Sequence, residues 1–267
     1  MTTTMYGPRP GEGPAPRVGP VDRVAVLSDV HANVPALTAV LAEVERAGAD
    51  LVVFCGDLTW GAEPDRTVEL VTALGDRARF VRGNGERAVV DMARGERVPE
   101  RERDRWMVTR HSPGSLDFVA SFPFSLVVDV TGLGPVRFCH GSPRSDTEVV
   151  TPGTPAERIT ALTAGIDEPT LVTGHTHLQF DRTVAGRRSI NPGSVGLPYH
   201  EGEPGTAYWA LLGPDVQLRQ TRYDVAAATA VGVRVGDPAA DRITELITSP
   251  PTPTEVIDQV EPLVFSD

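Results

Sequence analysis

The first half of the sequence alternates short apolar runs with segments of helical periodicity. Residues 24–27 and 51–55 have the length and composition of buried strands, and residues 79–81 form a third, shorter run. Apolar residues between positions 37 and 44 recur at helical spacing behind the first run, and residues 68–74 do so behind the second. This alternation predicts parallel strands joined by helical crossovers, which is an α/β fold.

The second half of the sequence is richer in strands. Residues 126–128 and 136–139 flank a glycine-containing turn and predict a β-hairpin. A helix is expected further on, because Thr154, Pro155 and Glu157 match a capping box with proline at the first helical position. More strands are expected at residues 171–173, 180–184, 187–190, 207–212 and 216–222.

Composition and pattern divide the chain into three regions. Residues 1–20 are crowded with Gly and Pro and lack apolar periodicity, so a flexible arm is expected there. Residues 21–224 contain the predicted strands and form the main domain. Residues 225–267 form a C-terminal extension that is expected to be partly helical, with a proline-rich break at 249–254.

A formal net charge of −11 limits the partners of the protein. Nucleic acids and anionic membranes prefer a basic surface, and no nucleic-acid-binding module is evident. No apolar stretch approaches the roughly 20 residues of a membrane helix, and the N-terminus does not resemble a signal peptide. Cys55 and Cys139 each end an apolar run and are expected to be buried free thiols, which fits a cytoplasmic location.

Side chains that commonly bind metals follow five of the predicted strands. Because ligands bind beyond the carboxyl ends of strands in α/β sheets, these side chains are expected to converge. A lone Asp often caps a helix and a lone His is often an ordinary polar residue, but four of the six histidines occupy these positions. The candidate ligands are Asp29, His31, Asp57, Asn84, His140, His175 and His177.

The residue types in this set indicate a catalytic metal site. Imidazole suits Zn, Fe and Ni, whereas carboxylate and amide oxygens suit harder ions such as Mn and Mg. A mixed set without thiolate therefore predicts a first-row transition metal with five or six ligands. A structural zinc site would usually have a closed tetrahedral shell rich in cysteine.

The order and wording of these motifs resemble the calcineurin-like metallophosphoesterase superfamily, whose pattern is D-x-H, GD, GN-H-D/E, H and GH-x-H. The similarity spans roughly residues 24–208. The small bacterial phosphodiesterase branch is most similar, through the segments Asp-Val-His-Ala-Asn, His-Gly-Ser-Pro, Gly-His-Thr-His and Asn-Pro-Gly-Ser. The resemblance implies a four-layer α-β-β-α sandwich of two mixed sheets, with a dimetal site at the carboxyl ends of the strands.

The resemblance also implies a role for each ligand. It assigns Asp29, His31 and His177 to one ion, Asn84, His140 and His175 to the other, and Asp57 to a bridge between them. A hydroxide between two ions roughly 3.5 Å apart would attack phosphorus in line, with Asp57, Asn84 and His140 acting directly in catalysis. The cofactors are expected to be two divalent transition-metal ions, Mn or Fe first, with Ni, Zn or Co as alternatives.

Three further polar residues have two open interpretations. Asn33, Thr176 and Asn191 are candidates for orienting the ligands, and the two asparagines are also candidates for binding substrate. Polar loop residues cap helices and close turns just as often, so a structural role is an equal alternative.

Gly85 departs from the family pattern. Many members carry a histidine directly after the asparagine of the third motif, where it is thought to bind phosphate and protonate the leaving group. Its absence predicts a rate that depends steeply on leaving-group pKa, and Gly85→His should flatten that dependence. His111 and His200 lie outside the metal set, and His200 is a candidate replacement acid if it does not simply lie in an exposed loop. The acidic Glu86 of the motif is retained.

Three functions remain open at this point. The first is hydrolysis of a phosphodiester or phosphomonoester bond in a small phosphorylated substrate, which the complete ligand set favours. The second is a non-catalytic metal-binding scaffold, which Gly85 favours. The third is a nuclease, which the acidic charge disfavours. The sequence does not specify the oligomeric state.

Overall fold

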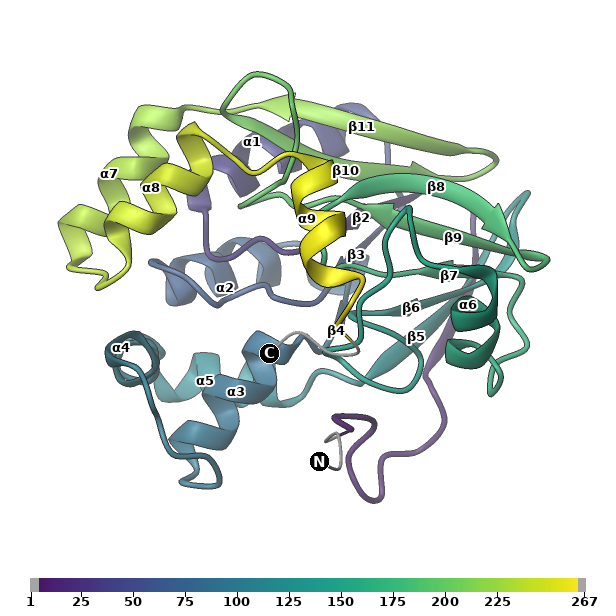
Figure 1. The fold of residues 1–267 in the computed structure, drawn as a ribbon, viewed down its shortest axis with the longest axis horizontal. Coiled ribbons are helices and arrows are strands. Elements are labelled where there is room, and N and C mark those ends of the chain that lie inside the picture. Colours follow the sequence, from purple (N-terminus) through teal and green to yellow (C-terminus); the bar gives the residue numbers. More distant parts are fainter. Residues whose placement is uncertain (1–4, 264–267) are drawn as a thin grey trace.

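Two mixed β-sheets packed face to face form the centre of the molecule (Figure 1). The structure is a computed structural model that describes residues 5–263. Within that range one sheet has the strand order β1-β5-β6-β7-β9-β8 and the other has the order β11-β10-β2-β3-β4. The strands are β1 (Arg17–Val21), β2 (Val24–Leu27), β3 (Leu51–Cys55), β4 (Ala78–Val81), β5 (Ser125–Val130), β6 (Gly134–Cys139), β7 (Thr170–Val172), β8 (Gln179–Val184), β9 (Arg187–Pro192), β10 (Thr206–Leu212) and β11 (Val216–Arg222).

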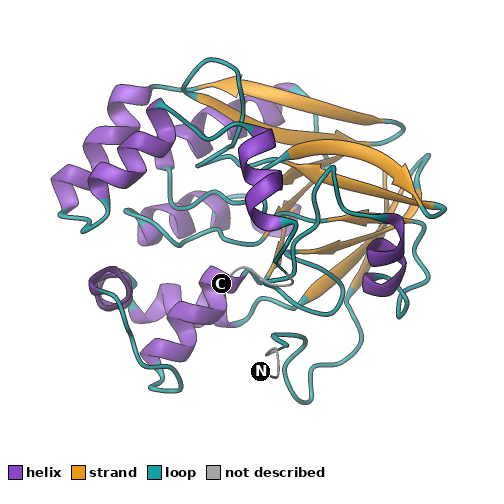
Figure 2. Ribbon diagram, viewed as in Figure 1, coloured by secondary structure: helices purple, strands orange, loops and turns teal. Residues whose placement is uncertain are grey.

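Helices cover the outer faces of both sheets (Figure 2). Apolar residues of α1, α2 and α5 pack on the five-stranded sheet, and α6 packs on the six-stranded sheet beside β8. The helices are α1 (Val34–Arg46), α2 (Pro64–Thr72), α3 (Asn84–Ala93), α4 (Glu102–Arg110), α5 (Pro113–Ala120), α6 (Ala156–Leu162), α7 (Val225–Val235), α8 (Ala240–Thr248) and α9 (Pro253–Val260), with a 3₁₀ turn, η1, at Gly75–Arg77.

The position of β2 between the helices and the second sheet explains why its sequence is apolar without interruption. Ala25 and Leu27 pack in the core beneath the helices, whereas Val24 and Val26 pack in the core between the two sheets. Successive strand residues point to opposite faces, so a strand in the middle of four layers buries every side chain. The predicted α/β class and the four-layer arrangement are confirmed.

The strand directions bring the polar loops together. β2, β3 and β4 are parallel and are connected through α1 and α2, as predicted. β5 and β6 form the predicted antiparallel hairpin, and β6 is parallel to β7 in the same sheet. The loops that follow β2, β3, β4, β6 and β7 therefore meet at one edge of the sandwich.

Part of the segment expected to be a flexible arm, residues 17–20, belongs to strand β1. β1 extends the six-stranded sheet by pairing in parallel with β5. Upstream of β1, the Arg9 guanidinium donates to the Ala120 carbonyl at 2.6 Å, and the Phe124 N–H donates to Glu12 Oε1 at 2.6 Å. Strand pairing and polar contacts with distant residues hold this segment in place. Neither kind of contact requires apolar residues at regular spacing, so the sequence pattern does not reveal it.

The helix predicted after Thr154 is present as α6, but the predicted capping box is not. Pro155 occupies the N-cap position and makes no side-chain cap. The Thr154 hydroxyl instead donates to Glu261 Oε1 at 2.5 Å, because α9 lies against this loop. A long-range contact has replaced the local one.

The C-terminal region contains α7, α8 and α9 and packs against the main domain. Ala228 of α7 and Ile247 of α8 bury an apolar surface against Leu197, while α9 contacts the loop before α6. Among the described residues 5–263, no helix combines the length and the apolar character needed to span a membrane.

Candidate metal centre

The seven predicted ligands lie together at the carboxyl ends of the strands. Two clusters of side chains have their ligand atoms within 4.8 Å of one another and share Asp29. Asn84 Oδ1 lies 3.0 Å from His140 Nε2, and the rings of His140 and His175 are centred 5.0 Å apart. The two clusters are Asp29, His31 and His177, and Asp29, Asp57 and His140.

The backbone is strained at most of these positions. Asp29, His31, Asp57, His175 and His177 all have φ between 49° and 65°, in the left-handed region that side chains avoid. Outside this set, Ala32 and Ala185 are the other non-glycine residues with positive φ in the described chain. Such strain persists where surrounding structure enforces it and gathers at functional sites.

The Asp29 carboxylate has one occupied and one unpaired oxygen. Its Oδ2 accepts from the Ser28 hydroxyl at 2.6 Å and from the His175 N–H at 3.0 Å. Its Oδ1 is fully buried and has no hydrogen-bond donor, yet it lies 3.2 Å from His177 Nε2. An unpaired buried carboxylate oxygen is costly, so this atom fits a site that binds a cation.

Asp57 lies between the histidines of the two clusters. Its Oδ1 is 3.5 Å from His140 Nε2, and its Oδ2 is 3.9 Å from His31 Nε2. Ligand atoms that each lie about 2.0–2.2 Å from a common ion are separated by distances of this order. The position suits a bridging ligand.

Backbone carbonyls orient three of the imidazoles. Nδ1 lies 3.1 Å from the Trp60 carbonyl in His31, 2.8 Å from the Cys55 carbonyl in His140 and 2.6 Å from the Leu197 carbonyl in His177. A carbonyl can only accept, so each Nδ1 carries the proton and each Nε2 is free to bind a metal.

Burial and charge set the protonation states expected for metal ligands. Burial lowers the pKa of His31 and of His175 to about 3, so both are neutral at neutral pH. Burial opposes ionisation of Asp29, but the surrounding imidazoles outweigh it and hold the pKa of Asp29 well below its usual range. At His140 and His177 the nearby carboxylates outweigh burial and raise the pKa, which shows that the centre attracts positive charge.

Glu86 positions the loop that carries Asp57, a role that sequence reasoning missed. Its Oε2 accepts from the backbone N–H groups of Asp57 and Gly83 at 2.9 Å each, and its Oε1 accepts from those of Leu58 and Thr59 at 2.8 and 3.1 Å. The side chain is fully buried. The signal available in the sequence was an acidic residue retained at the start of a helix.

Asn33 and Asn191 make structural contacts, and their contact with substrate stays a prediction. Asn33 caps α1 by accepting from the Ala36 N–H at 3.2 Å, and it donates to the Gly196 carbonyl at 3.0 Å. Asn191 is fully buried, donates to the Gly174 carbonyl at 2.7 Å and contacts the Thr176 hydroxyl at 3.2 Å. These contacts shape the loops around the histidines after β7.

Trp60 explains why position 85 is glycine. A Cβ added at Gly85 would lie 2.9 Å from Trp60 Cβ and 2.9 Å from Asp57 Oδ1. The Gly85 N–H also donates to Asp57 Oδ1 at 2.8 Å. A histidine at this position would displace the central carboxylate, so Gly85→His alone is unsuitable for restoring an acid, and a flatter dependence on leaving-group pKa is no longer expected from it.

Neither remaining histidine is a replacement acid in this conformation. His111 is buried and joins the Met107 carbonyl to the Thr59 hydroxyl, at 2.9 and 3.0 Å. His200 accepts from the Gly202 N–H at 2.9 Å and packs against the Tyr208 ring. His200 is 7% exposed, so the expectation of an exposed loop residue is wrong.

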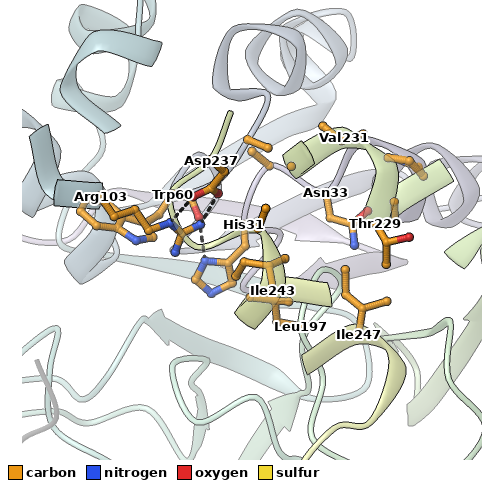
Figure 3. Close-up of a pocket in the computed structure, with 17 residues that line it drawn as sticks. His31, Asn33, Trp60, Arg103, Leu197, Thr229, Val231, Asp237, Ile243 and Ile247 are labelled. Carbon is orange, nitrogen blue, oxygen red and sulfur yellow. Dashed lines mark hydrogen bonds and ion pairs between the residues drawn. The ribbon is translucent and has the colours of Figure 1, made fainter. Parts of the chain in front are cut away.

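Two cavities adjoin the centre, and Trp60 lines both of them. One, of about 180 Å³, exposes His31, Asp57 and Asn84 to solvent. The other, of about 30 Å³, lies beneath α7 and α8, where Figure 3 shows Arg103 paired with Asp237 near His31 and Trp60. The larger cavity is the one that offers a substrate access to the candidate ligands.

Cys55 and Cys139 are buried free thiols, as predicted. Burial raises the pKa of both thiols well above the ordinary value, which suppresses the reactive thiolate. In the native protein neither is expected to react with Ellman's reagent at mildly alkaline pH, and both should react after unfolding in guanidinium. Rapid modification of a native thiol would contradict this burial.

The residues present fit a pair of divalent ions. Two carboxylates, an amide oxygen and imidazole Nε2 atoms converge, and the unpaired Asp29 Oδ1 lies among them. Asp29 reaches both clusters, whereas the family resemblance assigns it to one ion only. Three of the seven ligands, His31, Asn84 and His175, remain partly exposed, which leaves the centre open to a substrate.

Comparison with known proteins agrees with this geometry. The sequence pattern of the calcineurin-like phosphoesterase superfamily domain matches residues 23–212. An uncharacterised protein of Methanocaldococcus jannaschii is 25% identical over 225 residues, which are 77% of this chain and 89% of that protein. A metallophosphoesterase from Sphaerobacter thermophilus has a TM-score of 0.64 at 26% identity, covering 85% of this chain and 98% of its own.

A hypothetical protein from Pyrococcus horikoshii has the same fold, with a TM-score of 0.72 at 18% identity, over 86% of this chain and 99% of that one. The matched segment contains every predicted ligand and both sheets except β1 and β11. The chain belongs to the calcineurin-like phosphoesterase superfamily.

Proposed function

We propose that the protein hydrolyses a phosphodiester or phosphomonoester bond in a small substrate with the aid of two divalent transition-metal ions. The observation that carries the proposal is the buried, unpaired Asp29 Oδ1 among histidine Nε2 atoms that backbone carbonyls have oriented. Mn or Fe is the first choice for the ions, with Ni, Zn or Co as alternatives, because the donors mix nitrogen and oxygen without thiolate.

The chain's own residues would divide the work of catalysis. Divalent ions supply charge neutralisation at the phosphoryl oxygens and acidify a bound water. Asp57 lies where its two oxygens could each bind one ion and so set the distance between the ions. Glu86 holds the backbone N–H groups of Asp57 and Leu58 and so positions that carboxylate. The partly exposed His31 and Asn84 border the cavity through which the phosphoryl group would approach.

A small substrate is favoured over a nucleic acid. The cavity of about 180 Å³ is smaller than pockets that enclose a drug-sized ligand, which are about 300–1,000 Å³. The net charge of −11 opposes a general affinity for polyanions. A nuclease function therefore has less support than hydrolysis of a small phosphoester.

An activity panel tests the proposal against a non-catalytic scaffold. Nucleotides, cyclic nucleotides, sugar phosphates and phospholipid head groups would be assayed with Mn, Fe, Ni, Zn and Mg, alongside the metal content of the purified protein. Turnover that requires metal supports hydrolysis. Full metal occupancy without turnover of any class would favour the scaffold.

Hydrolysis of aryl phosphates is expected to depend steeply on the pKa of the phenol that leaves. Among the described residues lining the larger cavity, the titratable ones are the candidate ligands His31 and Asp57, and Arg97, which does not release its proton. Positioned general acids typically contribute about 10²–10⁴-fold, and most to poor leaving groups. Rates for a series of aryl phosphates would be measured with chemistry as the slow step, and a flat dependence would show that another acid acts.

A further inference from the structure

Arg97 lies in the wall of the cavity that exposes the candidate metal centre. It belongs to the loop between α3 and α4, and its N–H donates to the Asp91 carbonyl at 3.2 Å. Its side chain is half-buried, and the other lining residues are three candidate ligands together with Trp60, Gly85 and Ala88. No other arginine or lysine of the described chain lines this cavity.

The Arg97 guanidinium has no partner within residues 5–263. Other arginines of this part of the molecule are committed to carboxylates: Arg87 contacts Asp146 at 3.0 Å, and Arg103 forms a bidentate pair with Asp237 at 2.9 and 3.0 Å. Asp57 is the only carboxylate among the described residues that line this cavity, and it forms no ion pair with Arg97. The Arg97 guanidinium is therefore available to a ligand, and a guanidinium suits oxyanions such as carboxylate and phosphate.

Charge balance assigns Arg97 to a second anionic group. Two divalent ions would bring about four positive charges, and the ligand set offsets two of them through Asp29 and Asp57 because its other members are neutral as ligands. The remaining charge of about two is enough for one phosphomonoester group, which carries about −1.5 to −2, and more than enough for a diester. Arg97 adds a further positive charge on another wall of the same cavity.

We propose that Arg97 is a specificity residue that binds a second oxyanion of the substrate, so that the site favours phosphoesters bearing a carboxylate or another phosphate beside the group that is cleaved. The inference rests on the proposed hydrolysis. Trp60 and Asp57 leave no room for a side chain at position 85, so a residue there cannot contact the substrate. Arg97, which lines the same cavity, would supply a positive charge to the substrate instead.

The test uses two phosphonates that the enzyme cannot hydrolyse. Methylphosphonate carries the phosphoryl-like group alone, and phosphonoacetate adds one carboxylate. Calorimetry on the Mn-loaded protein is expected to show phosphonoacetate binding about tenfold more tightly to the wild type, the size of one charge-assisted contact. Arg97→Gln should bring the two affinities within about twofold, and Arg97→Lys should fall between, because it keeps the charge but loses the bidentate geometry.

Arg94→Gln is the matched control, since Arg94 is exposed at the end of α3 and does not line this cavity. It should keep the wild-type preference. Chelation of Mn by the added carboxylate would survive in Arg97→Gln, so a preference retained there overturns the assignment of Arg97. Equal binding of both phosphonates by the wild type also overturns it, whereas failure of the metal-loaded wild type to bind either one overturns the proposed function.

Discussion

Replacing Asp57 with asparagine is expected to reduce phosphoester hydrolysis by about a thousandfold or more. Asp57 Oδ1 lies 3.5 Å from His140 Nε2 and Oδ2 lies 3.9 Å from His31 Nε2, so one carboxylate serves both clusters. Metal-based charge stabilisation contributes several kcal/mol to a transition state, and each 1.36 kcal/mol corresponds to tenfold in rate. Asparagine keeps the shape of the side chain and an oxygen that can accept from the Gly85 N–H.

The Asp57→Asn variant would be compared with Asn84→Ala for kcat, metal content and melting temperature. Asn84 contacts His140 and lies beside one cluster only, so its loss should reduce activity less. Asp57→Asn should bind fewer than two ions while remaining folded. Near wild-type turnover with two bound ions would remove Asp57 from the bridging position.

The fold and the convergence of the candidate ligands were predictable because they depend on local pattern. An apolar run between helical segments at 24–27 and at 51–55 predicts a buried parallel strand, since the middle of a layered fold buries both strand faces. The carboxyl ends of such strands share an edge, so the sequence pattern alone places residues as distant as Asp29 and His177 together.

The remaining features depend on contacts between distant segments. β1 is ordered by β5, more than a hundred residues away, and nothing within residues 5–20 indicates that pairing. The exclusion of a side chain at Gly85 depends on where the backbone places Trp60. Asn191 is a plausible substrate contact by residue type, but it lies behind the histidine loop with its amide occupied.

Glu86→Gln is expected to destabilise the protein by about 2–6 kcal/mol. One Glu86 oxygen accepts from Asp57 and Gly83, and the other accepts from Leu58 and Thr59. Glutamine turns one of these oxygens into a donor, so two buried N–H groups would lose their acceptor and meet another donor. Each unsatisfied buried donor costs about 1–3 kcal/mol.

Urea unfolding of the metal-free protein would measure this change without the contribution of bound ions. Glu96→Gln is the control, because Glu96 is exposed on the loop after α3 and should change stability little. Glu86→Gln should also weaken metal binding more than Glu96→Gln does. The backbone around Asp57 would lose hydrogen bonds either at Asp57 and Gly83 or at Leu58 and Thr59, depending on which oxygen becomes the amide nitrogen. Equal unfolding free energies for the two variants would mean that the loop keeps its conformation without the Glu86 carboxylate, and the positioning of Asp57 would then have to come from β3 and the Gly85 N–H alone.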